Sequence, residues 1–225
     1  MKKTFSLCFI IITFLALLSG CGSSGGDDFG SNSILPGNIT GNSNASTIIM
    51  EAKSDINTGT TSSFKNALEK LNKLESNPTY SPSPEEKLLI KTGIKYCEIQ
   101  LDQSPIESTT TSSYLENIIT SSITSGIKIP QDTYYILACS YYGQRNNQDA
   151  IEMMKNIGKV NGIFVPNFTY TSEFQIAKSG DAHALMALLY YINGDNSNAI
   201  LQKSFVIDYS SIGADYLAKF PNAGL

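Results

Sequence analysis

Apolar residues recur at helical spacing along most of the chain. The clearest stripe consists of Phe64, Ala67, Leu68, Leu71 and Leu74, at relative positions i, i+3, i+4, i+7 and i+10. This spacing places all five side chains on one face of a helix. The stripe therefore predicts an amphipathic helix that buries one side in a core.

Prolines and capping residues predict where other helices begin. Residues 83–86 have the sequence Ser-Pro-Glu-Glu, which combines a hydroxyl cap, a proline in the first turn and two acids near the positive end of the helix dipole. We interpret the two glutamates as a helix start rather than as a catalytic carboxylate pair. Pro130 begins a further predicted helix. Less regular patterns predict helices at 47–55, 114–123 and 211–220.

Two later segments of the chain align with one another. Residues 137–151 and 186–200 each contain a small residue, a Tyr-Tyr pair that begins three positions later, and Ala-Ile eight positions after the second tyrosine. Such self-similarity predicts two copies of one structural unit. The signature residues are Ala138, Tyr141 and Ala150 in the first copy, and Ala187, Tyr190, Gly194 and Ala199 in the second.

This pattern resembles the tetratricopeptide repeat (TPR), in which helical hairpins stack on one another. The resemblance implies that the small residues let paired helices approach closely, and that the tyrosines fill the space between hairpins. Gly194 and Asp195 match the family's turn, whereas Arg145 stands at the equivalent glycine position. The implied fold is all-α, with about four antiparallel helix pairs stacked as a TPR-like superhelix with inserted loops. A generic helical bundle is the alternative.

The repeat spacing predicts where the inserted loops lie. Gly93 and Ala138 are 45 residues apart, and Ala138 and Ala187 are 49 apart, compared with about 34 in the family. The excess falls in 102–112 and in 158–172.

The second of these stretches is unusually apolar for a loop. A loop of this kind either packs over the repeats or contacts a partner. Its three aromatic residues form a candidate partner-contact loop: Phe164, Phe168 and Tyr170.

The first 20 residues differ from the rest of the chain. Two lysines precede an apolar run over 5–18, which is shorter than the roughly 20 residues of a membrane-spanning helix. The run ends in Leu-Ser-Gly-Cys at 18–21, which resembles the bacterial lipobox. The resemblance implies that 1–20 is a lipoprotein signal peptide, cleaved before Cys21, and that Cys21 carries a diacylglycerol. An ordinary secretory signal or a short membrane anchor is the alternative.

Residues 21–44 are rich in Gly, Ser and Asn, which predicts a flexible tether without a core. A tether of 24 residues would hold the helical domain at 45–225 roughly 25–30 Å from the membrane. In lipoproteins of bacteria with two membranes, an aspartate after the lipidated cysteine favours the inner membrane. Gly22 stands there, so the resemblance implies the outer membrane, with the domain facing the periplasm.

The charge balance excludes one class of partner. The chain has 16 basic and 20 acidic residues, a net charge of −4, and removal of Lys2 and Lys3 with the signal peptide makes it −6. An acidic chain without a basic run is a poor candidate for nucleic-acid binding. Lys87, Lys91 and Lys95 form one basic stripe. We expect a solvated helix face there, with a docking surface for an acidic partner as the alternative.

Residues able to carry catalysis are few. His183 is the only histidine, and we expect it to pack as a structural residue. The sequence contains no Ser-His-Asp set, paired-histidine metal motif or glycine-rich phosphate loop, so we predict no enzyme, no metal and no cofactor. Cys97 and Cys139 are the cysteines that remain once Cys8 is removed and Cys21 is acylated. We expect two small buried residues, with a disulfide as the alternative.

Together these patterns predict a non-enzymatic scaffold anchored to the cell envelope. Stacked helical repeats present a concave groove suited to a helix or an extended peptide. We therefore expect a protein or peptide partner in the envelope, in an outer-membrane, secretion or pilus assembly. The alternative is a surface lipoprotein that binds a glycan or peptide through its tyrosines. Tyrosines exposed in a groove would favour this alternative, and buried tyrosines would weaken it.

Overall fold

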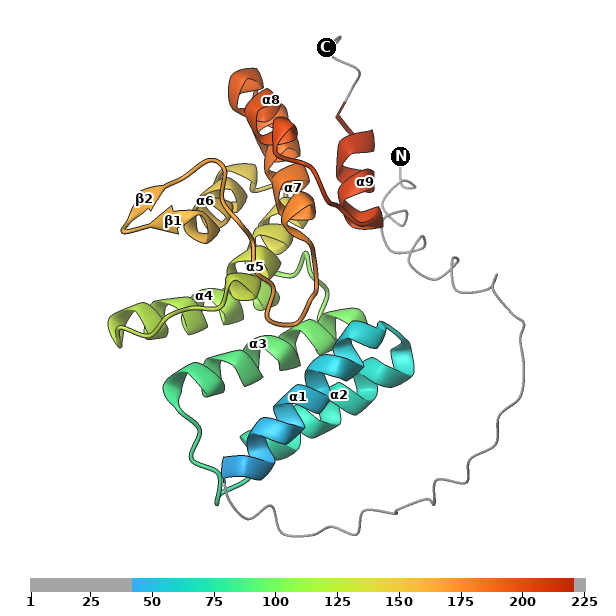
Figure 1. Cartoon of the computed structure of the whole chain (residues 1–225), viewed down its shortest axis with the longest axis vertical. Coiled ribbons are helices and arrows are strands. Elements are labelled where there is room, and N and C mark those ends of the chain that lie inside the picture. Colours follow the sequence, from blue (N-terminus) through green and yellow to red (C-terminus); the bar gives the residue numbers. More distant parts are fainter. Residues whose placement is uncertain (1–41, 221–225) are drawn as a thin grey trace, which may run out of the picture. The chain divides into compact units, whose positions relative to one another are not determined.

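The computed structural model describes residues 42–220. Within this range lie nine helices and one two-stranded antiparallel sheet. The predicted signal peptide, Cys21 and nearly all of the predicted tether fall outside the described residues. The elements (Figure 1) are α1 (Asn42–Thr58), α2 (Thr61–Glu75), α3 (Pro84–Gln100), α4 (Thr109–Thr124), α5 (Gln131–Gly143), α6 (Asn147–Ile157), β1 (Lys159–Val160), β2 (Ile163–Phe164), α7 (Ser179–Ile192), α8 (Asn196–Ser204) and α9 (Ser211–Ala218).

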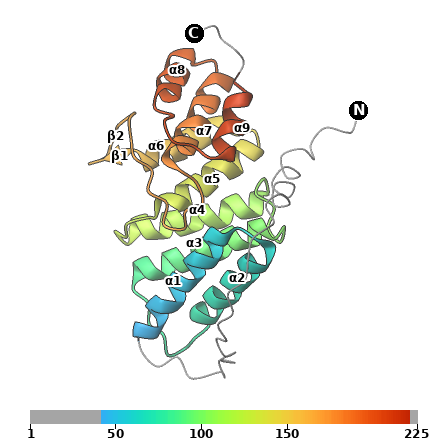
Figure 2. The same ribbon diagram turned by 45° about the vertical axis from the view of Figure 1, so that its right-hand side comes forward.

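Helices adjacent in the sequence pack against one another, which confirms the prediction of a mainly helical domain. The pairs α1–α2, α5–α6 and α7–α8 form hairpins joined by turns of two or three residues. α2 also packs on α3, α4 on α5, and α6 on α7, whereas α3 and α4 make only limited contact (Figures 1 and 2). Among the described residues, no helix combines the length and the apolar character needed to cross a bilayer.

The predicted stripe and helix start are both found at α2 and α3. Ala67 and Leu71 on α2 are fully buried, and Leu68 lies half-buried at the edge of the same face. At the start of α3, the hydroxyl of Ser83 accepts the backbone N–H of Glu86 at 3.2 Å. The Glu86 carboxylate in turn accepts the backbone N–H of Ser83 at 2.9 Å. This capping box satisfies two N–H groups that the helix itself leaves without partners.

The first predicted inserted loop is shorter than expected, because part of it is helical. α4 begins at Thr109, and only 101–108 connects it to α3. The Ser108 hydroxyl caps α4 by accepting the backbone N–H of Thr110 at 3.2 Å. Burial of one aliphatic face outweighs the low helix propensity of the surrounding serines and threonines. That face consists of Leu115, Ile118 and Ile119.

The second predicted loop contains regular structure that the sequence pattern did not indicate. It opens with the β1–β2 hairpin, in which Val160 pairs with Ile163. Residues 165–178 then run without helix or strand to the start of α7, and we call this segment the strap.

The strap is packed into the domain and does not lie loosely on its surface. Phe174 on the strap is 1% exposed. A Cβ atom built on Gly93 of α3 would lie 2.7 Å from the Phe174 ring and 2.8 Å from Leu71 of α2, so the absence of a side chain at Gly93 permits this close approach. Glu173, next to Phe174, pairs with Lys53 of α1 at 3.3 Å. The strap therefore connects the C-terminal hairpins to α1, α2 and α3.

The turns after α5 and α7 have the same backbone hydrogen bonds. In each, the central residue donates to the carbonyl three positions back at 3.0 Å, and the next residue donates to the carbonyl five positions back at 2.9 Å. The central residue has a left-handed backbone, with φ of 64° at Arg145 and 77° at Gly194. Arg145 thus preserves the turn that glycine forms in the second copy, in a conformation that L-residues adopt only with strain.

Candidate functional site

The repeat-signature residues lie on the packed helices, except Gly194, which lies in the exposed turn after α7. Tyr190 is 7% exposed, whereas Tyr141 is half-buried and its hydroxyl donates to Oε1 of Glu116 on α4 at 2.6 Å. Four signature residues are fully buried: Ala138, Ala150, Ala187 and Ala199.

α7 is enclosed by the rest of the domain. Every residue from Gly180 to Tyr190 is buried, and α9 packs along α7 (Figure 1). α9 also reaches α5, where Tyr216 Oη lies 3.8 Å from Sγ of Cys139 and its ring meets that of Tyr142 edge-on. In a TPR-like stack, the first helix of each hairpin would line the groove. Since α7 is buried from Gly180 to Tyr190, that part of α7 is not open to a partner.

A buried carboxyl group holds α9 in this position. Asp181, in the first turn of α7, is fully buried. Its Oδ1 accepts the backbone N–H groups of Ser210 and Gly213 at 2.7 and 3.0 Å, and its Oδ2 accepts that of Lys178 at 2.8 Å. Three backbone donors satisfy the buried carboxyl group, whose burial without partners would be strongly unfavourable.

Asp132, at the equivalent position of the preceding hairpin, is also fully buried. Its Oδ1 accepts the hydroxyl of Tyr170 at 2.5 Å, and its Oδ2 accepts the backbone N–H of Phe174 at 2.9 Å. Burial raises the pKa of Asp132, and these two hydrogen bonds oppose the shift. The sequence analysis missed both aspartates, although Asp132 and Asp181 are separated by the same 49 residues as the two repeat copies.

The aromatics of the candidate partner-contact loop face the protein's own core. Phe168 and Tyr170 are 6% and 5% exposed, and Phe164 is half-buried. The ring of Tyr170 stacks on that of Tyr135 of α5 with centroids 5.2 Å apart. A partner would therefore not meet Phe168 or Tyr170 in this structure. The exposed apolar side chains of the same stretch are aliphatic: Val160, Ile163 and Val165.

His183 packs in the core, which confirms that part of its prediction. It is 2% exposed, and its ring lies 4.3 Å from that of Phe168, centroid to centroid. Nδ1 is 2.8 Å from Oε1 of Gln202 on α8, and Nε2 is 2.9 Å from the carbonyl oxygen of Phe168. Nε2 of Gln202 donates to the carbonyl of Pro166 at 3.2 Å. His183 and Gln202 thus bind the start of the strap to α7 and α8.

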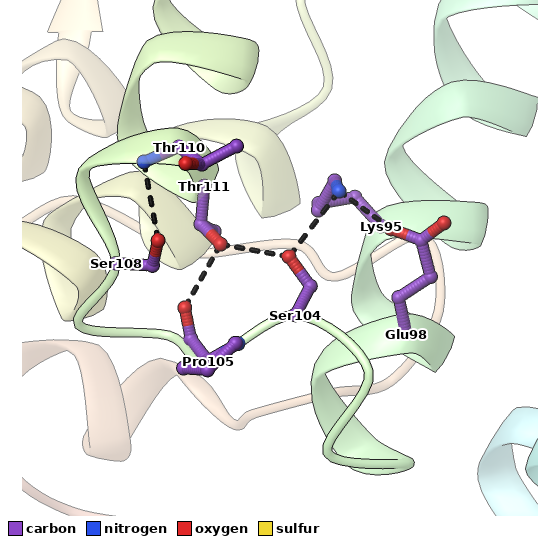
Figure 3. A network of polar contacts seen from close by, with 7 residues as sticks. All are labelled: Lys95, Glu98, Ser104, Pro105, Ser108, Thr110 and Thr111. Atoms are coloured by element: carbon purple, nitrogen blue, oxygen red, sulfur yellow. Dashed lines mark hydrogen bonds and ion pairs between the residues drawn. The ribbon is translucent and has the colours of Figure 1, made fainter.

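A second polar network joins α3 to α4 (Figure 3). Lys95 pairs with Glu98, and its Nζ donates to Oγ of Ser104 at 3.3 Å. The hydroxyls of Ser104 and Thr111 are 2.8 Å apart, and that of Thr111 donates to the carbonyl of Pro105 at 2.8 Å. Since the Thr111 proton is directed to Pro105, Ser104 donates to Thr111. The chain of donors ends at a backbone carbonyl, so it fixes the connection between the two helices.

Lys95 corrects part of the predicted basic stripe. Lys87 is exposed and Lys91 is half-buried, but the Lys95 side chain is only 11% exposed. Its Nζ also lies 4.5 Å from the centroid of the Tyr114 ring. The third lysine of the stripe is therefore buried and not solvated, because Glu98 and Tyr114 provide partners for its charge.

An open depression of about 460 Å³ lies beside this network on α4. Burial, together with Glu75 and Glu98, raises the pKa of the Tyr114 phenol to about 12. The side chains described as lining the depression are therefore uncharged at neutral pH, and they are rich in hydroxyl and amide groups. Such a lining suits a neutral polar ligand better than a charged one. The described lining residues are Thr109, Thr110, Ser113, Tyr114 and Asn117.

The two cysteines of the described domain are free thiols, so the alternative of a disulfide is not found. Burial raises the pKa of Cys97 to about 12 and that of Cys139 to about 11. Neither is a nucleophilic thiolate at neutral pH, since the thiolate is the reactive form. Across residues 42–220, no three His, Cys, Asp or Glu side chains are grouped to hold a metal ion.

Comparison of the chain with protein-family models, with curated proteins and with solved structures found no match. The buried polar groups described above bind the chain itself. Among the described residues, features open to a partner include the α4 depression, the outer face of the β1–β2 hairpin and the exposed parts of α3 and α5.

Proposed function

We propose that this protein is a lipid-anchored, non-enzymatic scaffold that binds a protein or peptide in the bacterial cell envelope, with its domain facing the periplasm from the outer membrane. The likeness of the α5–α6 and α7–α8 hairpins carries the proposal. They have the same turn hydrogen bonds, buried alanines at matching positions and a buried aspartate in the first turn. This recurrence supports TPR-like stacking, an architecture that binds helices or extended peptides.

The proposed binding face belongs to α3 and to α5, the first helix of the α5–α6 hairpin. α9 covers α7, whereas Lys87 and Lys91 on α3 and Tyr134 on α5 are exposed or half-buried. α3 and α5 contact one another, so these side chains can contribute to one surface. The lysines favour a partner segment that carries acidic residues.

Photo-crosslinking in intact cells tests this surface. A photoreactive amino acid is placed at Lys91 or at Tyr134, with Lys65 on the exposed face of α2 as the matched control. We expect the same envelope protein to be crosslinked from both test positions and not from Lys65. Adducts that are equal at all three positions, or absent from both test positions, would contradict a partner on this face.

Fatty-acid labelling tests the anchor separately. Cys21→Ser should abolish labelling by a fatty-acid analogue and release the protein from membranes, because the lipobox resemblance places the lipid on that thiol. Cys8→Ser is the matched control, since Cys8 lies in the predicted signal peptide, and it should leave labelling unchanged. Labelling that persists in Cys21→Ser would refute the lipobox.

A second candidate function is capture of a neutral glycan or peptide on α4. The depression favours it, because the Tyr114 ring lies there among hydroxyl and amide groups that can donate and accept hydrogen bonds with a neutral ligand. Burial of Tyr135, Tyr170 and Tyr190 weakens the broader prediction of a tyrosine-rich surface. Calorimetry with soluble envelope glycans would compare Tyr114→Ala with Tyr209→Ala, an exposed control. Binding lost only in Tyr114→Ala would support this candidate, and binding unaffected by Tyr114→Ala would exclude the α4 site.

A further inference from the structure

The β1–β2 hairpin projects from the helices (Figure 1) and carries exposed apolar side chains. Val160 and Ile163 are paired across the hairpin, and directly paired residues of antiparallel strands point to the same face. Phe164 points to the other face and packs toward Phe168, with ring centroids 6.2 Å apart. Val160 is 59% exposed, Ile163 is 72% exposed and Val165 is 38% exposed. The outer face is therefore aliphatic and faces solvent.

The backbone holds these side chains in a defined arrangement. The central turn residues Asn161 and Gly162 have φ of 52° and 80°, the combination of a type I′ turn, whose twist matches that of the strands. At the base, the N–H of Val165 donates to the carbonyl of Gly158 at 2.9 Å. Because the hairpin is already formed, binding through its tip would require little further ordering.

We propose that the β1–β2 hairpin inserts its tip shallowly into the lipid bilayer to which the protein is anchored, an inference that rests on the proposed lipid on Cys21. The aliphatic patch has only three side chains, whereas a stable protein interface needs about 800 Å² from each partner. Lys159 is the only charged residue in 158–170, although the whole chain has a net charge of −4. Lys159 is paired with Phe164, so its side chain points to the face opposite the aliphatic patch, where its Nζ donates to Oδ1 of Asn156 at 2.6 Å. At the base of a tip that enters the bilayer end-on, this cation lies at headgroup level, which suits anionic lipid headgroups.

The tether makes a weak insertion effective. The hairpin's aliphatic side chains bury less apolar surface than one myristoyl chain, which alone gives only marginal binding. If 21–44 is the flexible tether that its composition predicts, it raises the effective concentration of the hairpin at the bilayer to the order of millimolar. From Cys21 to Asn42 the chain advances 21 positions, which span at most about 75 Å when extended. This length lets the hairpin reach the bilayer although it lies away from the start of α1 (Figure 1).

Single-tryptophan fluorescence tests the proposal, because the chain has no tryptophan of its own. The chain from residue 21 onward, carrying Ile163→Trp, is coupled through Cys21 to maleimide-lipid in vesicles of phosphatidylethanolamine and phosphatidylglycerol. Cys97 is buried and the pKa of Cys139 is raised, so Cys21 is the thiol that reacts at neutral pH. We expect the emission to shift to shorter wavelength on coupling and to be quenched by brominated acyl chains. Uncoupled protein mixed with the same vesicles should show little shift.

Three variants make the outcome specific. Ile207→Trp is the matched probe, since Ile207 is an isoleucine with 88% exposure outside the hairpin, and its emission should not shift. Adding Val160→Asp to Ile163→Trp should abolish the shift. Lys159→Glu should reduce the shift on anionic vesicles and leave it unchanged on neutral vesicles.

Two results would overturn the proposal: an emission of Ile163→Trp that coupling leaves unchanged, or a shift that appears only when an envelope protein is added. The second would assign the hairpin to a protein partner. Because the lipid is attached to Cys21 by maleimide chemistry, neither result depends on whether cells lipidate that cysteine. Failure of the proposed anchor would be seen instead in the fatty-acid labelling of Cys21→Ser.

Discussion

The α1–α2 and α7–α8 hairpins are stabilised in different ways. α2 buries one apolar face, and partly exposed ions lie beside its contact with α1, such as Lys70, which pairs with Asp55 of α1 at 2.9 Å. α7 is buried from Gly180 to Tyr190, and its core includes the polar side chains of Asp181 and His183. The first hairpin depends on apolar periodicity, whereas the second depends on individual polar partners. Substitutions of polar residues should therefore matter far more in the second.

The largest effect is expected from a substitution in the strap, which links these two regions. Phe174→Ala should lower the free energy of unfolding by about 4 kcal/mol, because the ring is buried against α2 and α3 and its loss leaves a cavity. We also expect amide hydrogens of α1 and α2 to exchange faster. Urea unfolding and hydrogen exchange measure these two effects. Unchanged hydrogen exchange in α1 and α2 would show that the strap does not couple the stability of the C-terminal hairpins to that of α1 and α2.

Asp181→Ala tests the polar side of the comparison. The substitution leaves three backbone N–H groups without their acceptor, at Lys178, Ser210 and Gly213, and should cost about 3 kcal/mol. Lys70→Ala is the matched control in the first hairpin. Its ion pair is partly exposed, so it should cost less than about 1 kcal/mol. Urea unfolding of both variants decides the matter, and equal losses would remove the distinction between the hairpins.

The sequence was sufficient for the elements that depend on periodicity. The stripe on α2 and the capping box at Ser83 need only residues within a few positions of one another, so they are visible in the sequence. The helix starting after Pro130 follows for the same reason. Phe174 could not be placed in this way, because Gly93 is 81 residues earlier and nothing local indicates their contact.

The polar groups of the candidate site were only partly predictable. Asp132 and Asp181 recur at the repeat spacing, yet their role depends on donors from the strap and from α9. Lys95 was misplaced because helical spacing defines a stripe but does not show that Glu98 and Tyr114 draw its end inward. In each case the missing information was a contact between segments.

Tyr170→Phe tests a buried polar contact through the pH dependence of its effect on stability. The Tyr170 hydroxyl lowers the pKa of Asp132 against the raising effect of burial, so its removal should raise that pKa further. A carboxyl group whose pKa is raised by folding stabilises the fold below its unfolded value of 3.8. That contribution is lost as pH rises through the folded pKa. The variant should therefore cost about 2 kcal/mol at pH 7, where the acceptor is charged, and about 1 kcal/mol near pH 3.

Urea unfolding at the two pH values measures this difference. Tyr209→Phe, at an exposed tyrosine, is the control and should change stability at neither pH. A cost of Tyr170→Phe that is the same at both pH values would mean that the hydroxyl does not respond to ionisation of Asp132.

The smallest effect concerns the turns that the two repeat copies share. Arg145 adopts φ of 64° where Gly194 adopts 77°, and a left-handed backbone favours glycine over alanine by about 1 kcal/mol. Arg145→Gly should therefore be more stable than Arg145→Ala by about that amount. Both variants delete the arginine side chain, so its contacts cancel in the comparison. Gly194→Ala should be less stable than the wild type by a similar amount, because it introduces the same strain in the second copy. Thermal unfolding of the three variants measures the differences. Equal stability of the two Arg145 variants would show that the turns, despite their common hydrogen bonds, do not impose the same backbone requirement.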